Sequence, residues 1–527
     1  MSHPDTKSVA KGVSILGITG IICKLVGVLF SIPLNMISTE IATVFYVVYP
    51  TYTLLLTISS AGLPVAVSRM VAGFLARSDA RNARNTFRVA LLSLFSVGAV
   101  FSLLMVVLNS QLTAMVNVEE ASLGFYAIAP CVLIVCVLSA FRGFIQGQQN
   151  MFPTAISQLI EQVGKVVVSL PLAYIGIHHY HSVTYGAAGA LFGITVAEFA
   201  ALIYMLVRTR IHRNDINRIP QAEEEKLMEN KTLLRRLVTI SIPITISACI
   251  IPLSTFIDSA MMIDRMMVAG LAKADAKSAY GIYTSVVIRL INIPTALALA
   301  ISMSLVPVIS ARRSVNDIAG IHSESNTGMR YAFLIGFPCS VGMSLLSREI
   351  VSFFYGDVAS FSAAQIQLAS ELLTFSAMTV VLFTAVQATS SILQGIRKQK
   401  IPMYTMMAGV AVKIVLNYTL IGTKGIDIHG GPIASIACYS VAMILNFIFM
   451  CRHARMPFNW KDWVLKPGLA SALMGVAVYG AKLILPSGRL WTILEIILGV
   501  VVFLGSAFLL KAVTKDDLRA MARRSKS

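Results

Sequence analysis

Residues 142–165 of the chain read RGFIQGQQNMFPTAISQLIEQVGK. A hydrophobic run arrives at Arg142, a turn rich in Gly and Gln follows, and Pro153 opens the next hydrophobic run. Glu161 and Lys165 lie in that second run, one helical turn apart. The stretch therefore predicts two hydrophobic helices joined by a tight turn, with ionisable residues well inside the second helix.

Parts of this stretch occur twice in the chain. The repeated residues are Gln146-Gly147, Pro153 and Lys165, which recur as Gln394-Gly395, Pro402 and Lys413, offset by 248 or 249 residues, and Pro64 to Arg69, which recur loosely as Pro307 to Arg312, offset by 243. Near-equal offsets in the same order predict a duplicated half, as in transporters built from internal repeats.

The composition identifies a membrane protein. Of 527 residues, 56% are hydrophobic and only 13% are charged, and the mean hydropathy is +0.76. Charged residues make up about a quarter of an ordinary soluble chain. The seven cysteines form no CxxC pair, so disulfides and thiolate metal sites are not expected. The first apolar run contains Lys24 and lacks a small-residue cleavage site, which predicts a retained span.

The apolar runs predict an all-α polytopic membrane protein of about fourteen transmembrane helices, since a span needs about 20 apolar residues. The predicted spans are 12–35, 44–68, 87–109, 122–141, 152–176, 185–207, 237–263, 279–309, 329–347, 366–394, 402–422, 432–451, 465–485 and 490–511. With the N-terminus in the cytoplasm, 32 Lys and Arg lie on the cytoplasmic side and seven on the other. This asymmetry predicts that both termini are cytoplasmic. It also accounts for the net charge of +18 without nucleic acid.

The span count divides the chain into four parts. Residues 1–207 form an N-terminal six-helix lobe, and residues 208–236 form a polar cytoplasmic linker. Residues 237–451 form a C-terminal six-helix lobe, pseudo-symmetric with the first. Residues 452–527 add two transmembrane helices and a basic cytoplasmic tail.

Signatures of soluble enzymes are missing from the sequence. There is no GxxxxGK[ST], GxGxxG or HExxH motif, and no aspartate pair of the DxD type. The cluster His178-His179-Tyr180-His181 has no Cys or carboxylate close in sequence, so a solvated loop is favoured over a metal site. The sequence predicts no metal, no cofactor and no catalytic residue.

Ionisable residues inside the spans are the informative ones, because a charge in the membrane is costly unless it faces water or a partner. The simplest interpretation of Glu161 and Lys165 is an internal ion pair, structural or coupling. Lys24 and Arg289 have no acid nearby in sequence. They either meet Glu198 or Asp258 across helices, or face a wet cavity that would suit an anionic substrate.

Several motifs carry a resemblance to a known family. They are Gly62 to Arg69, Arg142 to Met151, Pro153-Thr154-Ala155 with Gln158 and Glu161, Arg289 to Pro294, Phe354-Tyr355-Gly356 and Leu393-Gln394-Gly395. With these motifs the chain resembles the multidrug/oligosaccharidyl-lipid/polysaccharide (MOP) flippase superfamily, in its polysaccharide biosynthesis branch. Within the branch it is most similar to the stage V sporulation protein B group and to MurJ-type lipid II flippases of Gram-positive bacteria.

The resemblance implies two six-helix lobes around a cavity that opens alternately to either face. It implies that Lys24 and Arg289 bind the pyrophosphate of the substrate, with Asn292 one turn further along. Where lipid II flippases carry further basic residues, this chain has Phe30 and Leu56. Where they carry acidic neighbours, it has Thr43, Ile288 and Asn292.

These observations predict a flippase of the bacterial cytoplasmic membrane that moves an undecaprenyl-pyrophosphate-linked saccharide by alternating access. The expected substrate is lipid II or a related cell-wall or cortex precursor. The expected partners are this anionic lipid, the surrounding membrane lipids, and a coupling ion or the membrane potential. A cation-coupled multidrug exporter of the same fold is an alternative, with Glu198 and Asp258 as coupling residues. A membrane-embedded glycosyltransferase is a second alternative, which the missing metal-binding aspartates disfavour.

Overall fold

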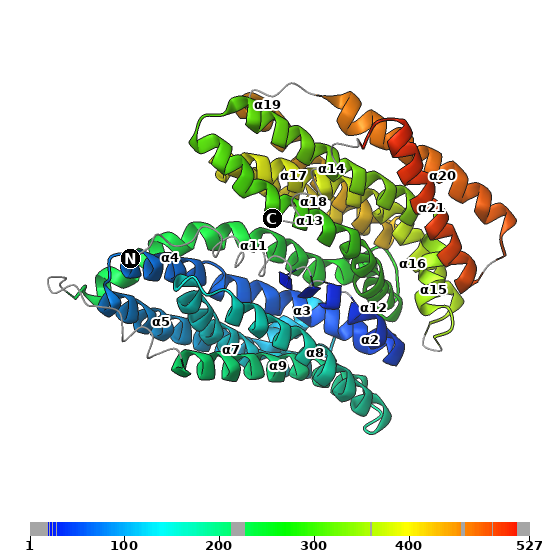
Figure 1. The fold of residues 1–527 in the computed structure, drawn as a ribbon. Coiled ribbons are helices and arrows are strands. Elements are labelled where there is room, and N and C mark those ends of the chain that lie inside the picture. Colours follow the sequence, from blue (N-terminus) through cyan, green and yellow to red (C-terminus); the bar gives the residue numbers. More distant parts are fainter. Residues whose placement is uncertain are drawn as a thin grey trace. The chain divides into compact units, whose positions relative to one another are not determined.

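The computed structural model describes residues 19–513 apart from 21, 24, 28, 212–226, 359–360, 455–458 and 487. The described residues form helices and no strands, which confirms the all-α prediction (Figure 1). The earlier helices are α2 (Ser31–Ile37), α3 (Thr39–Ser60), α4 (Leu63–Leu75), α5 (Ala80–Val107), α6 (Asn109–Val116), α7 (Ala121–Gly147), α8 (Phe152–His178), α9 (Val183–Ile211), α11 (Asn230–Val268) and α12 (Lys273–Ile282). The later ones are η1 (Tyr283–Val287), α13 (Ile288–Ser314), α14 (Ile318–Leu345), α15 (Ser347–Tyr355), α16 (Ala363–Ser376), α17 (Met378–Gly395), α18 (Lys400–Ile421), η2 (Asp427–His429), α19 (Gly430–Ala454), η3 (Lys461–Leu465), α20 (Lys466–Ile484) and α21 (Arg489–Leu509).

Most of these helices can cross a bilayer. Among the described residues, twelve are long and apolar enough, and a thirteenth span is formed if α14 and α15, bent by 73° at their junction, are counted together. Thirteen of the fourteen predicted spans correspond to these helices. Of the predicted span 12–35, residues 12–18, 21, 24 and 28 lie outside the described residues, and its later part forms a shorter apolar helix, Leu25–Ile37. Apolar side chains such as Leu92 and Leu103 on α5 are 68% and 62% exposed, as side chains facing lipid would be.

The chain divides into two compact units, which we describe separately. The first unit is Met1–Met267 with Ala272–Gly281, and the second is Val268–Leu271 with Ile282–Ser527. This division differs from the lobe boundary predicted near residue 237, because α11 belongs with the first unit. Leu233 and Leu237, near the start of α11, are fully buried in an apolar cluster that includes Phe74 and Phe144.

The predicted duplication has a counterpart in the turns of the backbone. The turn after α7 places Gln149 in the left-handed region at φ 63°, and the turn after α17 places Arg397 there at φ 65°, 248 residues further on. Non-glycine residues rarely adopt this conformation. Asp79 and Asp317 also repeat a feature, since each caps the N-terminus of the following helix, α5 or α14, through its side chain.

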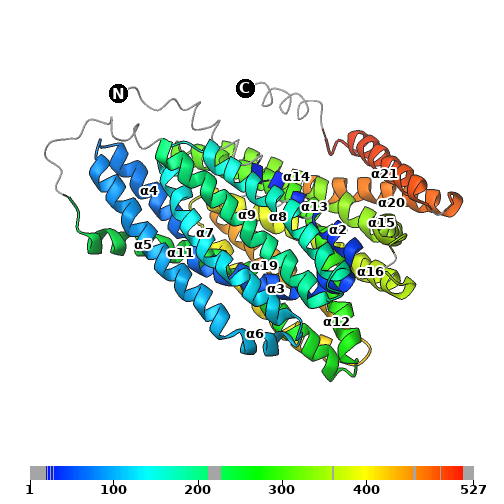
Figure 2. The same cartoon turned by 90° about the horizontal axis from the view of Figure 1, so that it is seen from below.

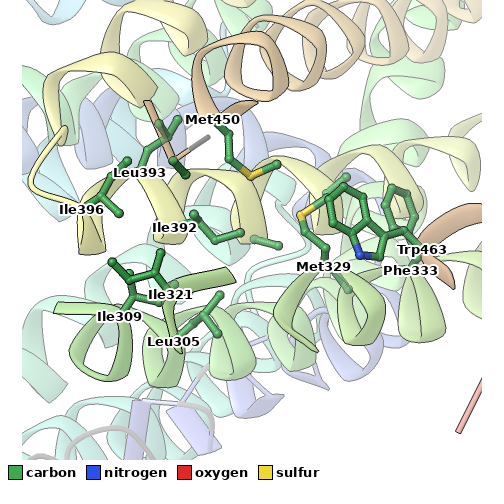
Figure 3. Packing of buried hydrophobic residues seen from close by; sticks show 14 of the residues in the cluster. Leu305, Ile309, Ile321, Met329, Phe333, Ile392, Leu393, Ile396, Met450 and Trp463 are labelled. Carbon is green, nitrogen blue, oxygen red and sulfur yellow. The ribbon is translucent and has the colours of Figure 1, made fainter. Parts of the chain in front are cut away.

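Each unit has its own apolar core. In the first unit, α7 packs against α5 and α9, and α8 lies beside α9, as both views show (Figures 1 and 2). In the second unit, α13, α14, α17 and α19 enclose a cluster around Ile309, Met329, Ile392 and Met450 (Figure 3). Trp463, 1% exposed, closes this cluster and donates a hydrogen bond from Nε1 to Asn326 Oδ1 at 2.8 Å. α20 and α21 lie against each other beside α14.

Candidate functional site

Three helices of the first unit bring ionisable side chains together inside the membrane. α8 follows α7 after a short turn with the left-handed Gln149, so the end of α7 lies near the first turns of α8. Arg142 lies five residues before the end of α7, and Ser157 and Glu161 lie in the first turns of α8, so the three residues meet across the turn. α9 packs on both helices and contributes Glu198, which is 3% exposed.

Arg142 holds the centre of this group. Its Nε donates to Ser157 Oγ at 2.9 Å, and its Nη2 donates to Glu161 Oε2 at 3.1 Å. Gln162 Nε2 donates to the other carboxylate oxygen, Oε1, at 3.1 Å. These contacts add a partner that the sequence did not predict, since Glu161 forms an ion pair with Arg142 on the neighbouring helix. The predicted pair of Glu161 with Lys165 stays a prediction.

Lys165 lies in an aromatic box. Its Nζ is 4.6 Å from the ring centroid of Phe30, 5.4 Å from that of Phe45 and 4.9 Å from that of Tyr49. The side chain is buried, and a cation over an aromatic face is attracted by the ring quadrupole. Phe30, which stands where the resembled flippases carry a basic residue, therefore forms a wall around a cation of this chain.

Glu198 completes the group. It interacts electrostatically with Glu161, Arg142 and Lys165, and its Oε2 is buried without a hydrogen-bond partner among the described atoms. Two acids and two bases give a formal charge of zero. Gain of a proton or a small cation would make the group positive, and such a change inside the membrane is the chemistry of proton relays and ion-coupled transport.

Arg289 and Asn292 belong to the second unit. Arg289 follows directly after the π-helix η1, and its Nε donates to the backbone oxygen of Thr284 at 3.2 Å. Single turns of π-helix are frequent at functional sites. Asn292 is half-buried on the same helix, α13.

An apolar groove runs beside Arg289 in the second unit. Its volume is about 480 Å³, and it is lined from α13, α14, α15, α20 and α21. Leu290, Ile293 and Leu297 of α13 form part of its wall. Arg289 is not among the lining residues, but it directly precedes Leu290 on α13, so a cation lies next to one wall of the groove.

The remaining predicted residues lie apart from these groups or outside the described structure. Asp258 is buried on α11 of the first unit. Lys24 lies outside the described residues, so its expected role at a pyrophosphate site stays a prediction. Among the described residues, no group of three or more His, Cys, Asp and Glu side chains is placed to hold a metal ion.

Sequence reasoning missed two components of the site. Arg142 directly follows the predicted span 122–141, and its contact with Glu161 was not predicted. The short turn at Gln149 could have indicated this contact, because a tight turn brings residues at similar distances on either side of it close together. The aromatic box was also missed, since Phe30, Phe45 and Tyr49 are far from Lys165 in sequence.

Fold and site together define a multi-pass, all-helical membrane protein with ionisable side chains inside its spans. The family model "Polysaccharide biosynthesis protein" matches residues 9–312, and the MatE model matches residues 243–419. The chain therefore belongs to the polysaccharide biosynthesis protein family.

Relatives and solved structures agree with this assignment. The chain is 26% identical to "Lipid II flippase MurJ" of Bacillus subtilis over 89% of its length and 87% of that protein. It is 25% identical to "Stage V sporulation protein B" of the same organism over 86% of both chains. A structure of "Lipid II flippase MurJ, inward closed conformation" matches at a TM-score of 0.71, with 15% identity, 93% of this chain and 97% of the other. A structure of an inward-facing multidrug resistance MATE family transporter of the MOP superfamily matches at a TM-score of 0.65 and 14% identity. The match covers 83% of this chain and 98% of the other. At these identities the structural matches show the fold alone.

Proposed function

We propose that the chain is a flippase that carries an undecaprenyl-diphosphate-linked saccharide across the bacterial cytoplasmic membrane by alternating access. The proposed cargo is a peptidoglycan precursor, lipid II or a related precursor of the spore cortex. Its membership of the polysaccharide biosynthesis family and its relatives, a lipid II flippase and a sporulation protein, support this cargo class. No covalent chemistry is required of the protein.

The observation that carries the proposal is the cation beside the apolar groove. A lipid diphosphate has an anionic head and a long apolar chain, and the two parts need opposite surroundings. Arg289 offers a planar fork that can grip two phosphate oxygens. The groove next to it offers about 480 Å³ of apolar surroundings for part of the chain.

The first unit would then supply the coupling. The group formed by Arg142, Glu161, Lys165 and Glu198 is neutral when all four are ionised, and it becomes cationic when Glu198 takes a proton. A net positive charge at this depth is costly, so gain or loss of this proton would favour one conformation over another. We propose that Glu198 is the residue whose protonation follows transport, and that both termini are cytoplasmic, as the distribution of Lys and Arg favours.

Complementation tests this proposal. The chain is expressed in a strain depleted of its lipid II flippase, and protein abundance is checked by immunoblot. Wild type should restore growth, Arg289→Ala should fail at normal abundance, and Arg289→Lys should be intermediate, because Lys keeps a point charge without the fork. Gly342→Leu fills the groove where an added Cβ has 3.8 Å to its nearest neighbour, Met474 Cε, and should fail. Gly480→Leu, on α20 but facing open space, is the matched control and should complement.

A cation-coupled exporter is the second candidate. The MatE model covers residues 243–419, and Glu198 is a buried acid with an unpartnered oxygen. Wild type that fails to complement but gives cells measurable drug efflux, lost in Glu198→Gln, would favour the exporter. Full complementation by Arg289→Ala would also contradict the flippase proposal.

A further inference from the structure

A second cavity lies in the first unit, away from the acid–base group described above. It has a volume of about 560 Å³ and is formed between α4 and the first turns of α11. Four arginines line it, and we call it the Arg pocket: Arg69, Arg77, Arg235 and Arg236, together with Thr232, Thr239, Met70, Gly73, Phe74 and Ile240. No carboxylate is among these lining residues.

The four guanidinium groups have no acidic partner among the described residues. Arg77 is held at the rim by its own turn, with Nε donating to the Gly73 backbone oxygen at 3.2 Å and Cζ lying 5.3 Å from the Phe74 ring centroid. Arg312 of the second unit shows the ordinary arrangement, since it pairs with Asp317 at 2.9 Å and with Glu324 at 3.8 Å. Four neighbouring arginines without acids repel one another, and an anion between them removes that cost.

The walls of the Arg pocket are fixed by packing on both sides. At one end α4 and α11 approach closely, with Gly62 N donating to Thr245 Oγ1 at 3.1 Å. A Cβ on Gly62 would lie 2.2 Å from the Ser241 backbone oxygen, so only glycine allows this approach. At the other end, Asn85 on α5 donates to Asn230 Oδ1 at 2.9 Å and ties down the start of α11. The cavity between these two attachments is therefore preformed.

The chemistry of the lining indicates the ligand. Arginine forks and threonine hydroxyls bind phosphate oxygens, and the N-terminal turn of α11 adds the positive end of its helix dipole. Along α11, Thr239 shares a face with Ile242 and Ile246, each 50% exposed. A cationic pocket next to an exposed apolar stripe on a membrane helix is complementary to a phospholipid. The pocket suits the anionic head group, and the stripe suits the acyl chains.

We propose that the Arg pocket binds a phosphate-bearing head group, that of an anionic phospholipid, at the end of the spans. Basic pockets between transmembrane helices bind anionic lipid head groups in this way. The occupant would tie α4 to α11. This proposal does not rest on the transport proposal, because it involves neither Arg289 nor the groove beside it.

Lipid binding by the purified full-length protein tests the proposal. Native mass spectrometry counts retained lipids after mixing with micelles of phosphatidylglycerol or phosphatidylcholine, and thermal shift reports stabilisation. Wild type should retain phosphatidylglycerol in preference to phosphatidylcholine. The double variant Arg235→Gln/Arg236→Gln should bind phosphatidylglycerol about tenfold more weakly or worse, because charge-assisted bonds to phosphate are among the strong ones.

Two further variants separate a pocket from a merely basic surface. Gly73→Leu keeps all four arginines, and an added Cβ meets nothing within 4 Å, so it should fill the cavity and reduce binding without unfolding the protein. Arg88→Gln removes an exposed arginine of α5 that does not line the cavity, and it should bind like wild type. Unchanged binding in both Arg pocket variants, or an equal loss in Arg88→Gln, would overturn the proposal.

Sodium pyrophosphate distinguishes the two sources of phosphate. Phosphatidylglycerol retained in the presence of millimolar pyrophosphate would support a lipid occupant. If pyrophosphate raises the melting temperature and the protein shows no preference among lipids, the proposed lipid occupant is overturned. The Arg pocket would then be a site for a soluble phosphate.

Discussion

The two halves of this protein repeat a backbone but not its chemistry. At the offset of 248 residues, Arg142 corresponds to Ser390 and Glu198 to Asn446. In the first unit the corresponding positions form a charged group around Arg142 and Glu161. In the second unit they form a neutral network, in which Asn446 donates to Ser390 Oγ at 3.0 Å and to Thr389 Oγ1 at 3.3 Å.

The neutral network is complete. Thr405 Oγ1 donates to Asn446 Oδ1 at 2.6 Å, and Asn446, Thr389 and Thr405 are all buried. Neutral amide and hydroxyl groups therefore suffice to join α17, α18 and α19. Because α17, α18 and α19 are joined without an acid–base pair at the positions of Arg142 and Glu198, we infer that the charged pair of Arg142 and Glu161 and the buried acid Glu198 are present for transport rather than for folding.

The largest expected effect follows from removing Arg142. Arg142→Met leaves Glu161, whose side chain is 22% exposed, without its partner, which costs up to about 3–5 kcal/mol. Membrane abundance and the melting temperature should fall strongly, whereas Ser390→Ala, the counterpart in the second unit, should change them little. The double variant Arg142→Met/Glu161→Gln should recover most of the loss. Strictly additive losses would contradict the pairing.

A smaller effect is expected from the neutral network. Asn446→Leu removes the amide that joins Thr389, Ser390 and Thr405, at a cost of about 1–3 kcal/mol. The melting temperature should fall while transport per folded molecule stays near that of wild type. Transport lost without a change in melting temperature would show that the network has a role beyond folding.

The two repeated lysines provide the next comparison. Lys165→Met should retain the packing of the aromatic box and lose a cation–π contribution of about 0.5–2 kcal/mol. We expect nearly normal abundance and defective complementation. Lys413→Met in the second unit should complement, because Ser390 and Asn446 stand there at the positions of Arg142 and Glu198. Equal growth of the two strains would remove the functional distinction between the lysines.

The smallest expected effect concerns the loop before α7. Burial alone raises the pKa of Glu120, but the hydrogen bond from Lys277, with Lys273 nearby, holds this pKa below its usual value of 4.5. The contribution to stability is therefore complete above about pH 4.5 and is lost as the pH falls through the lower folded value. It should stay below about 1 kcal/mol, since both side chains are partly exposed.

Thermal unfolding of wild type and Lys277→Met from pH 7 to pH 4 measures this contribution. The difference between the two proteins should shrink towards the acid end. Lys273→Met is the control, because its partner Glu119 is 87% exposed and the pair should contribute less. A difference that grows towards acid pH would contradict the assignment.

The sequence predicted the helical class and thirteen of the described spans because hydrophobic length alone determines them. It also predicted the repeat, since turn residues such as Gln149 and Arg397 follow matching motifs. The grouping of α11 with the first unit was not predictable from span counting, because it depends on side-chain packing at Leu233 and Leu237.

The candidate site was predicted only in part. Hydropathy identified Glu161, Lys165 and Glu198 as ionisable residues at membrane depth, and the structure brings them into one group. The contact of Arg142 with Glu161 was not predicted, because an i,i+4 rule considers one helix, whereas Arg142 reaches Glu161 from another. The groove beside Arg289 was not predicted, since its walls come from five helices spread over more than 200 residues.

Transport by Glu198→Asn in proteoliposomes tests most directly whether the charged group of the first unit serves transport. The substitution installs the residue that the second unit carries at the corresponding position. We expect a melting temperature close to that of wild type. The rate of undecaprenyl-diphosphate-saccharide translocation should be at least about tenfold lower, which corresponds to an activation free energy about 1.4 kcal/mol higher. Translocation at the wild-type rate by a fully folded Glu198→Asn protein would contradict that role.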